Sequence, residues 1–135
     1  LGIGKDVRFL GALEEKKKNA LLSLTDIFIM SSESEGCPTA LLEAMFFEKP
    51  IIARKIGGVP EILIDGESGI LVATRDVKRF SDAILDLARD KEKRLRFGKK
   101  AREVFDGRFT NSHMIAAYED IYARLLQRRT DQCAE

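Results

Sequence analysis

The chain has 135 residues, of which 44% are hydrophobic and 33% are charged, and this length and composition indicate one globular domain. Its 23 Lys and Arg residues balance 22 Asp and Glu residues, so no overall field attracts nucleic acid, which we exclude as a partner. Two cysteines, Cys37 and Cys133, are too few for a disulfide framework, and no apolar run reaches the length of a membrane span. A reducing cytoplasm fits this pattern.

Four short β-rich runs are predicted at residues 7–10, 26–30, 50–53 and 69–72. Most of them are continuous apolar stretches, which is typical of parallel strands that are covered on both faces. Between these runs, helical patterns are predicted at residues 14–24, 38–47 and 59–64. Three further helical patterns follow, and the clearest apolar stripe extends from Met114 to Leu126. We expect an α/β fold with a parallel, Rossmann-like sheet over residues 1–128 and a flexible tail over 129–135.

The helix predicted at 38–47 has an unusual start. Pro38 fits the first helical position, because the N–H that it lacks has no helical partner there. This places Cys37 at the N-cap, where a thiol caps poorly, so several backbone amides need an acceptor. These amides belong to Thr39, Ala40 and Leu41. Because a parallel strand and Gly36 precede this start, the pattern indicates an anion site, most often for phosphate. The alternative is that Ser32 or Ser34 caps the helix and nothing binds.

Two carboxylates flank this helix start. Glu43 falls in the second turn of an otherwise apolar helix, too far along for the helix start to explain it. A carboxylate there suits a vicinal diol, because it can accept both hydroxyl hydrogens, as it commonly does for ribose. Glu35 lies near the expected phosphate and is better aimed at a neutral group such as sugar hydroxyls. The alternatives are a partly exposed helix carboxylate for Glu43 and a solvated loop for Glu35.

Other candidate residues carry weaker signals. Gly57 and Gly58 follow the run at 50–53, and we expect a structural use for them, with a close approach to a ligand as the alternative. His113 is the only histidine and is expected at the surface. The sequence holds no metal-ligand cluster, no nucleophile–histidine pair and no dinucleotide fingerprint, so we expect neither a metal nor a cofactor.

The segments "SESEGCPTALLEAM" and "KPIIARKIGGVPEILIDGESGILV" resemble the C-terminal lobe of retaining, family 4-type glycosyltransferases of the GT-B fold. The resemblance runs from about Val7 to Tyr122. It implies that Glu43 holds the ribose of a nucleotide-diphosphate sugar and that Glu35, as the catalytic residue, contacts the donor sugar. It also implies that the helix-start amides take the diphosphate. The nucleotide-sugar-binding residues that it implies are Gly11, Leu13, Glu35, Gly36, Cys37, Pro38, Thr39, Ala40, Leu41 and Glu43. Of these, Gly11 and Leu13 would lie near the base.

The chain also departs from the family pattern. Phe46, Phe47 and Glu48 stand where the family usually has small residues and a glycine, so we expect that helix to end differently. The family's lobe begins with two further strand–helix units, which bring an Arg/Lys pair that neutralises the leaving diphosphate, and neither unit occurs here. The missing strands would lie between the runs at 7–10 and 26–30. We therefore expect either disorder up to about Thr25 or a homo-oligomer that completes the sheet by strand exchange.

Several functions fit these observations. The resemblance implies the donor-binding portion of an enzyme that moves a sugar to a glycan, lipid or small-molecule acceptor, with no activity expected of this fragment alone. Its partners would be the donor and the missing N-terminal part or lobe, in the cytoplasm or peripherally at the inner face of the membrane. The alternative is a non-catalytic nucleotide-sugar-binding or interaction module that needs a partner chain. A GT-B-like sugar-nucleotide epimerase fits less well.

Overall fold

The computed structural model describes the backbone of residues 2–132 and the side chains of residues 2–127. The described part contains one sheet of three parallel strands in the order β1-β2-β3. The strands are β1 (Phe28–Met30), β2 (Ile51–Arg54) and β3 (Ile70–Val72). Their register aligns Ile29 with Ile52 and Ile52 with Ile70. The parallel α/β architecture predicted from the sequence is therefore confirmed.

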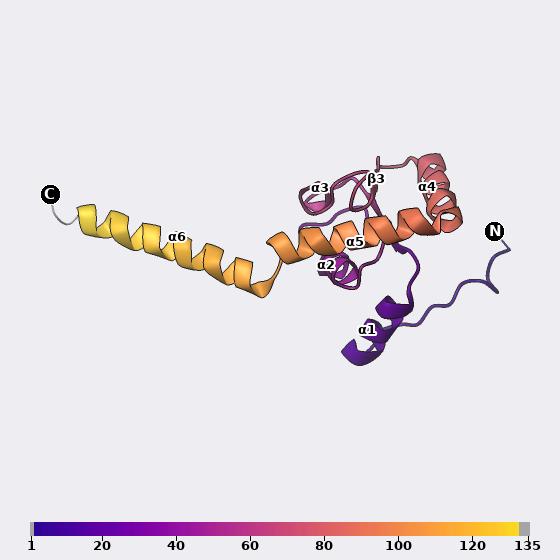
Figure 1. The fold of residues 1–135 in the computed structure, drawn as a ribbon, viewed down its shortest axis with the longest axis horizontal. Helices are drawn as coiled ribbons and strands as arrows, with labels where there is room; N and C mark the ends of the chain where they lie inside the picture. Colours follow the sequence, from indigo (N-terminus) through magenta and orange to yellow (C-terminus); the bar gives the residue numbers. More distant parts are fainter. Residues whose placement is uncertain (1, 133–135) are drawn as a thin grey trace.

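Six helices lie within the described residues (Figure 1). They are α1 (Glu15–Leu24), α2 (Thr39–Phe46), α3 (Val59–Ile62), α4 (Val77–Arg89), α5 (Lys91–Arg108) and α6 (Asn111–Gln132). α2 begins one residue later than expected, because Pro38 occupies the N-cap and Cys37 lies outside the helix. No described helix is both long enough and apolar enough to cross a membrane.

The central strand β2 divides the interior into two cores. Its alternate residues point to opposite faces of the sheet. Ile51 and Ala53 pack in the core that α2 and α3 cover, while Ile52 packs with Leu87 and Phe97 in the core beneath α4. α5 contacts both α2 and α4 and contributes to both cores (Figure 1). The five side chains just named are at most 2% exposed. The burial of each therefore contributes most of the hydrophobic stabilisation that a side chain of its size can provide.

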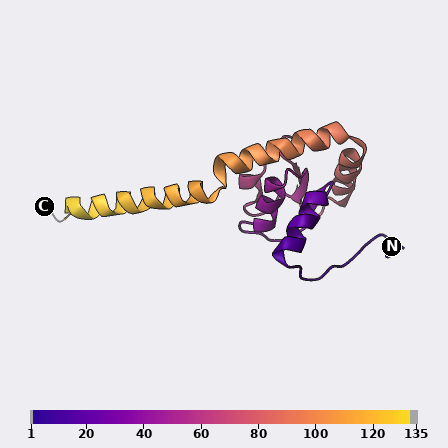
Figure 2. The same ribbon diagram turned by 60° about the horizontal axis from the view of Figure 1, so that its bottom comes forward.

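The strand predicted at residues 7–10 is absent, and this prediction was wrong. Residues 2–14 form no strand, and Phe9 is 96% exposed. A strand must satisfy its backbone N–H and C=O groups with a neighbouring strand, and none of the described strands lies beside this segment. In Figures 1 and 2 the segment runs along the outside of the molecule from the N-terminus to α1. Because α1 forms, the expected disorder up to Thr25 is also wrong for residues 15–24.

α6 extends away from the rest of the molecule (Figures 1 and 2). The apolar stripe predicted from the sequence faces solvent here: Met114, Tyr118 and Leu125 are each more than half exposed. Residues 129–132 continue the backbone of α6, whereas residues 133–135 lie outside the described residues. The expectation of a flexible tail over 129–135 stays a prediction, as does strand exchange with another copy.

α2 ends in a turn that requires a left-handed backbone. Glu48 has a φ of 55°. Its amide donates to the carbonyl of Met45, and the amide of Lys49 donates to the carbonyl of Ala44, each at 3.0 Å. These two bonds form a Schellman motif, in which the left-handed position usually holds glycine. The helix therefore ends as a glycine-terminated helix would, contrary to our expectation, with Glu48 in a conformation that is unfavourable for a side-chain-bearing residue.

We predict that Glu48→Gly raises the free energy of unfolding by about 1 kcal/mol, because glycine adopts the left-handed region without the steric cost of a Cβ. Urea denaturation of the purified chain measures this change. Glu48→Ala is the matched control, since it removes the carboxylate and keeps the Cβ. Equal stability of the glycine and alanine variants would show that the backbone of residue 48 carries no strain.

Two glycines of α5, Gly98 and Gly107, have different surroundings. A Cβ on Gly98 would lie 2.0 Å from the backbone oxygen of Glu48, whereas a Cβ on Gly107 would meet nothing within 4 Å. Gly98 therefore lets α5 approach the end of α2 closely, and Gly107 has no such role.

We predict opposite effects of the same substitution at these two positions. Gly98→Ala should lower the free energy of unfolding by about 1–3 kcal/mol, because the new methyl group displaces backbone in a packed region. Gly107→Ala should raise it by up to about 1 kcal/mol, because Gly107 lies in the last turn of α5 and alanine favours a helical backbone over glycine. Thermal and urea denaturation measure both variants, and effects of the same sign would contradict the close approach at Gly98.

Candidate functional site

The candidate site lies at the carboxyl edge of the sheet, where parallel strands of an α/β fold present their ligand-binding loops. One loop connects the end of β1 to α2 and carries Glu35 and Gly36, while the next follows β2 and carries Gly57 and Gly58. The two loops meet directly, because the amide of Gly58 donates to the carbonyl oxygen of Glu35 at 3.3 Å.

The contact between these loops leaves no space for side chains. A Cβ on Gly57 would lie 1.8 Å from the backbone oxygen of Glu35, and one on Gly58 would lie 2.0 Å from that of Gly36. Gly57 also has a φ of 44°, in the left-handed region. We expected a structural use for these two glycines, and the structure shows one, since they allow the two loops to touch. The close contact with Gly57 and Gly58 fixes the backbone of Glu35. The sequence alone did not reveal this contact between the two loops.

The start of α2 has no side-chain cap, so neither Ser32 nor Ser34 plays that part. The amide of Leu41 donates to the carbonyl of Pro38 at 3.0 Å and therefore has an acceptor, contrary to our expectation. The exposed residues Thr39 and Ala40 keep amides that have no acceptor among the described residues. No acidic residue lies in the first turn, so the positive end of the helix dipole is not neutralised within it. This arrangement suits an anion.

Glu43 is half-buried on α2 and forms an ion pair with Lys18 of α1, whose Nζ donates to its Oε1 at 2.5 Å. This pair could not be predicted from the sequence, because the two residues are 25 positions apart and belong to different helices. The carboxylate of Glu35 is also half-buried, yet it has no hydrogen-bond or ion-pair partner among the described residues.

The remaining predicted site residues differ in their surroundings. Cys37 is exposed and its thiol is free. Gly11 has a φ of 63° and open space around its Cα, and Leu13 is half-buried just before α1. No hydrogen bond joins Gly11 or Leu13 to α2 in the described part of the chain. A role near a nucleotide base stays a prediction for these two residues.

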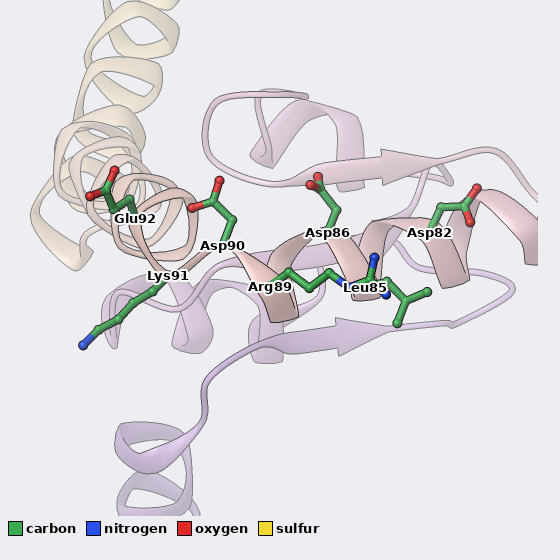
Figure 3. Close-up of a pocket in the computed structure, with 7 residues that line it drawn as sticks. All are labelled: Asp82, Leu85, Asp86, Arg89, Asp90, Lys91 and Glu92. Atoms are coloured by element: carbon green, nitrogen blue, oxygen red, sulfur yellow. The ribbon is translucent and has the colours of Figure 1, made fainter.

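An open cavity of about 570 Å³ lies elsewhere, along α4 and the start of α5 (Figure 3). Three of the four carboxylates in its lining have partners. Asp82 accepts from Lys78 at 2.7 Å, and Asp86 accepts from Lys93 at 2.6 Å. Asp90 caps α5 by accepting from the amide of Lys93. The hydrogen bond to Asp82 raises the pKa of Lys78 above its ordinary value. No group of three or more described His, Cys, Asp or Glu side chains is placed to hold a metal ion.

Comparison with known protein families shows which family this chain resembles. The family model described as Glycosyl transferases group 1 matches residues 1–104. The chain belongs to this family. A curated member, N-acetyl-alpha-D-glucosaminyl L-malate synthase of Bacillus anthracis, is 32% identical over 127 residues, which is 94% of this chain and 33% of that protein. The chain thus spans about a third of the length of that relative.

Solved structures agree with this assignment. The C-terminal domain of the glycosyl transferase group 1 family protein LpcC from Francisella tularensis has a TM-score of 0.74 and 26% identity. The match covers 82% of this chain and 57% of that domain. HepE from Anabaena, solved in complex with UDP-glucose, has a TM-score of 0.79 and 24% identity, covering 94% of this chain and 34% of HepE. The expected Rossmann-like, C-terminal lobe of the GT-B fold is therefore confirmed for this member of the family.

We predict that Gly58→Ala moves the Glu35 loop, because the new methyl group would overlap the backbone oxygen of Gly36. The amide resonances of Glu35 and Gly36 should shift in a ¹⁵N-correlation spectrum, with a loss of about 1–3 kcal/mol in the free energy of unfolding. Gly4→Ala is the control, since a Cβ there would meet nothing within 4 Å. Unchanged Glu35 and Gly36 resonances in Gly58→Ala would contradict the contact.

Proposed function

We propose that this chain is the donor-binding portion of a retaining, family 4-type glycosyltransferase. The complete enzyme would move a sugar from a nucleotide-diphosphate sugar to an acceptor. The observation that carries the proposal is the start of α2, where Thr39 and Ala40 offer amides without a described acceptor at the positive end of a helix. Such a helix start suits a diphosphate, and it can stabilise the negative charge that develops on the diphosphate as the sugar leaves.

The two carboxylates take different parts in this proposal. Glu43 lies about one turn beyond the proposed diphosphate position and accepts hydrogen bonds from the ribose hydroxyls. Glu35 has no described partner, and its backbone is held by Gly58, so its carboxylate is free to contact the hydroxyls of the donor sugar. Retention means that the new bond to the sugar forms on the face that the diphosphate leaves, so the sugar must stay oriented while that bond breaks. Orienting it is the catalytic role that we propose for Glu35.

The comparisons support a sugar-nucleotide donor. HepE was solved with UDP-glucose and also with UDP, and its chain has the same fold over 94% and 93% of the present sequence. The names of the curated relatives include D-inositol 3-phosphate glycosyltransferase of Corynebacterium glutamicum, at 31% identity over 126 residues. Because this chain covers only 30% of that relative, the acceptor site belongs in our proposal to the rest of the enzyme.

The proposal extends to the cellular setting. The free, exposed thiol of Cys37 suits a reducing compartment, so we place the enzyme in the cytoplasm. Peripheral association of the complete enzyme with the inner face of the membrane is part of the same proposal, because lipids are among the acceptor classes that we consider.

We predict that Glu43→Ala weakens nucleoside-diphosphate binding by at least about 1 kcal/mol, because charge-assisted hydrogen bonds to the ribose are lost. Calorimetric titration with UDP, GDP and ADP measures this effect. Glu35→Ala should bind the bare nucleotides nearly as well as the parent and should lose affinity only for the corresponding nucleotide sugars.

The control for both variants is Glu67→Ala, which removes an exposed carboxylate from the loop before β3. Equal effects of Glu43→Ala and Glu35→Ala on nucleotides and nucleotide sugars would refute the division of roles. Binding of a nucleotide sugar without transfer, in a protein that also contains the acceptor-binding part, would favour a non-catalytic binding module over the enzyme.

A further inference from the structure

The carboxylate proposed to hold the ribose already has a cationic partner. The Nζ of Lys18 donates to Oε1 of Glu43 at 2.5 Å, and the two side chains are 38% and 36% exposed. A charge-assisted hydrogen bond of this length restricts the orientation of the carboxylate. A carboxylate has about four acceptor positions, and Lys18 uses one of them, so Oε2 keeps its full capacity to accept hydroxyl hydrogens.

A second contact holds α1 close to the end of α2. Near the other end of α1, the Nζ of Lys49 donates to the carbonyl of Ser23 at 2.8 Å. Lys49 lies three residues beyond the end of α2, so the two contacts link α1 to α2 and to the turn that follows it. Leu22 is the buried residue of α1, so the helix has little apolar anchoring of its own. The ion pair thus defines where the start of α1 meets the candidate site.

The neighbouring lysine provides a natural comparison. Lys17 is 71% exposed, and its partner in the described part of the chain is Glu14, at 3.8 Å just before the same helix. Lys18 instead crosses to another helix and contacts a residue of the candidate site. The two lysines have the same chemistry and adjacent positions in α1, yet only Lys18 can influence the orientation of Glu43.

We infer that Lys18 is a positioning residue for the donor nucleotide. This inference rests on the proposed ribose role of Glu43. By holding Oε1, Lys18 fixes the side chain of Glu43 before the ligand arrives, so that less conformational freedom is lost when the ribose diol binds. The effect of Lys18 is therefore specific to ligands that carry ribose hydroxyls. A lysine that only helped to hold α1 in place would affect all nucleotides alike.

The test compares each of UDP, GDP and ADP with its 2′,3′-dideoxy counterpart by calorimetric titration of the purified chain. We expect Lys18→Met to weaken binding of the best-binding ribonucleotide about fivefold to tenfold, the range that one charge-assisted hydrogen bond supports. It should leave binding of the dideoxy counterpart unchanged. Lys17→Met is the matched control and should bind both ligands as the parent does. In a Glu43→Gln background, Lys18→Met should have no further effect.

The outcomes separate this inference from the proposed function. If the parent chain binds the ribonucleotides and their dideoxy counterparts equally, the ribose role of Glu43 fails, and the inference fails with it. If the parent discriminates between them but Lys18→Met behaves as Lys17→Met does, the positioning role alone is overturned. Tighter ribonucleotide binding by Lys18→Met would mean that Lys18 competes with the ribose, which also overturns it. Lys18→Ala repeats the comparison with a shorter side chain, and circular dichroism checks that each variant retains its helices.

Discussion

The contact between the turn at Gly57 and Gly58 and the backbone of Glu35 and Gly36 is the constraint on which the candidate site depends. Because two loops from neighbouring strands touch through their backbones, the position of Glu35 is set by β2 as well as by β1. The end of α2 is held in a similar way, where Gly98 of α5 meets the carbonyl of Glu48. α2 is therefore fixed at both ends by glycines from elsewhere in the chain, and the Glu43 backbone lies between these two contacts. Such contacts tolerate little change, since backbone cannot move aside as a side chain can.

Much of the fold could be predicted from the sequence because apolar runs report burial. The runs at 26–30, 50–53 and 69–72 became β1, β2 and β3 with shifts of one or two residues at their ends. The run at 7–10 has a similar composition and forms no strand. The apolar character of a segment does not indicate whether a neighbouring strand is present. Hydrogen bonding between strands is a property of the whole sheet, and residues 7–10 have no partner in its described part.

The candidate site was predicted only where its signals are local. The lack of a side-chain cap on α2 and the position of Glu43 in its second turn follow from a few adjacent residues. The pair between Lys18 and Glu43 and the contact of Gly58 with Glu35 depend instead on which elements lie side by side, and short sequence patterns do not encode that. The left-handed conformation of Glu48 was missed for another reason, because the usual glycine signal is missing and the surrounding structure imposes the turn.

The exposed stripe of α6 has a consequence for the order in which the molecule unfolds. Most helices in proteins owe their stability to packing of an apolar face, and the described residues of this face are largely exposed. α6 therefore depends on its own backbone hydrogen bonds and on local pairs such as that between Arg124 and Asp120. These bonds are open to solvent, so their amide hydrogens exchange readily, whereas those of β2 exchange only when the sheet opens. On warming, we expect α6 to melt as a separate unit while the two cores around β2 remain intact.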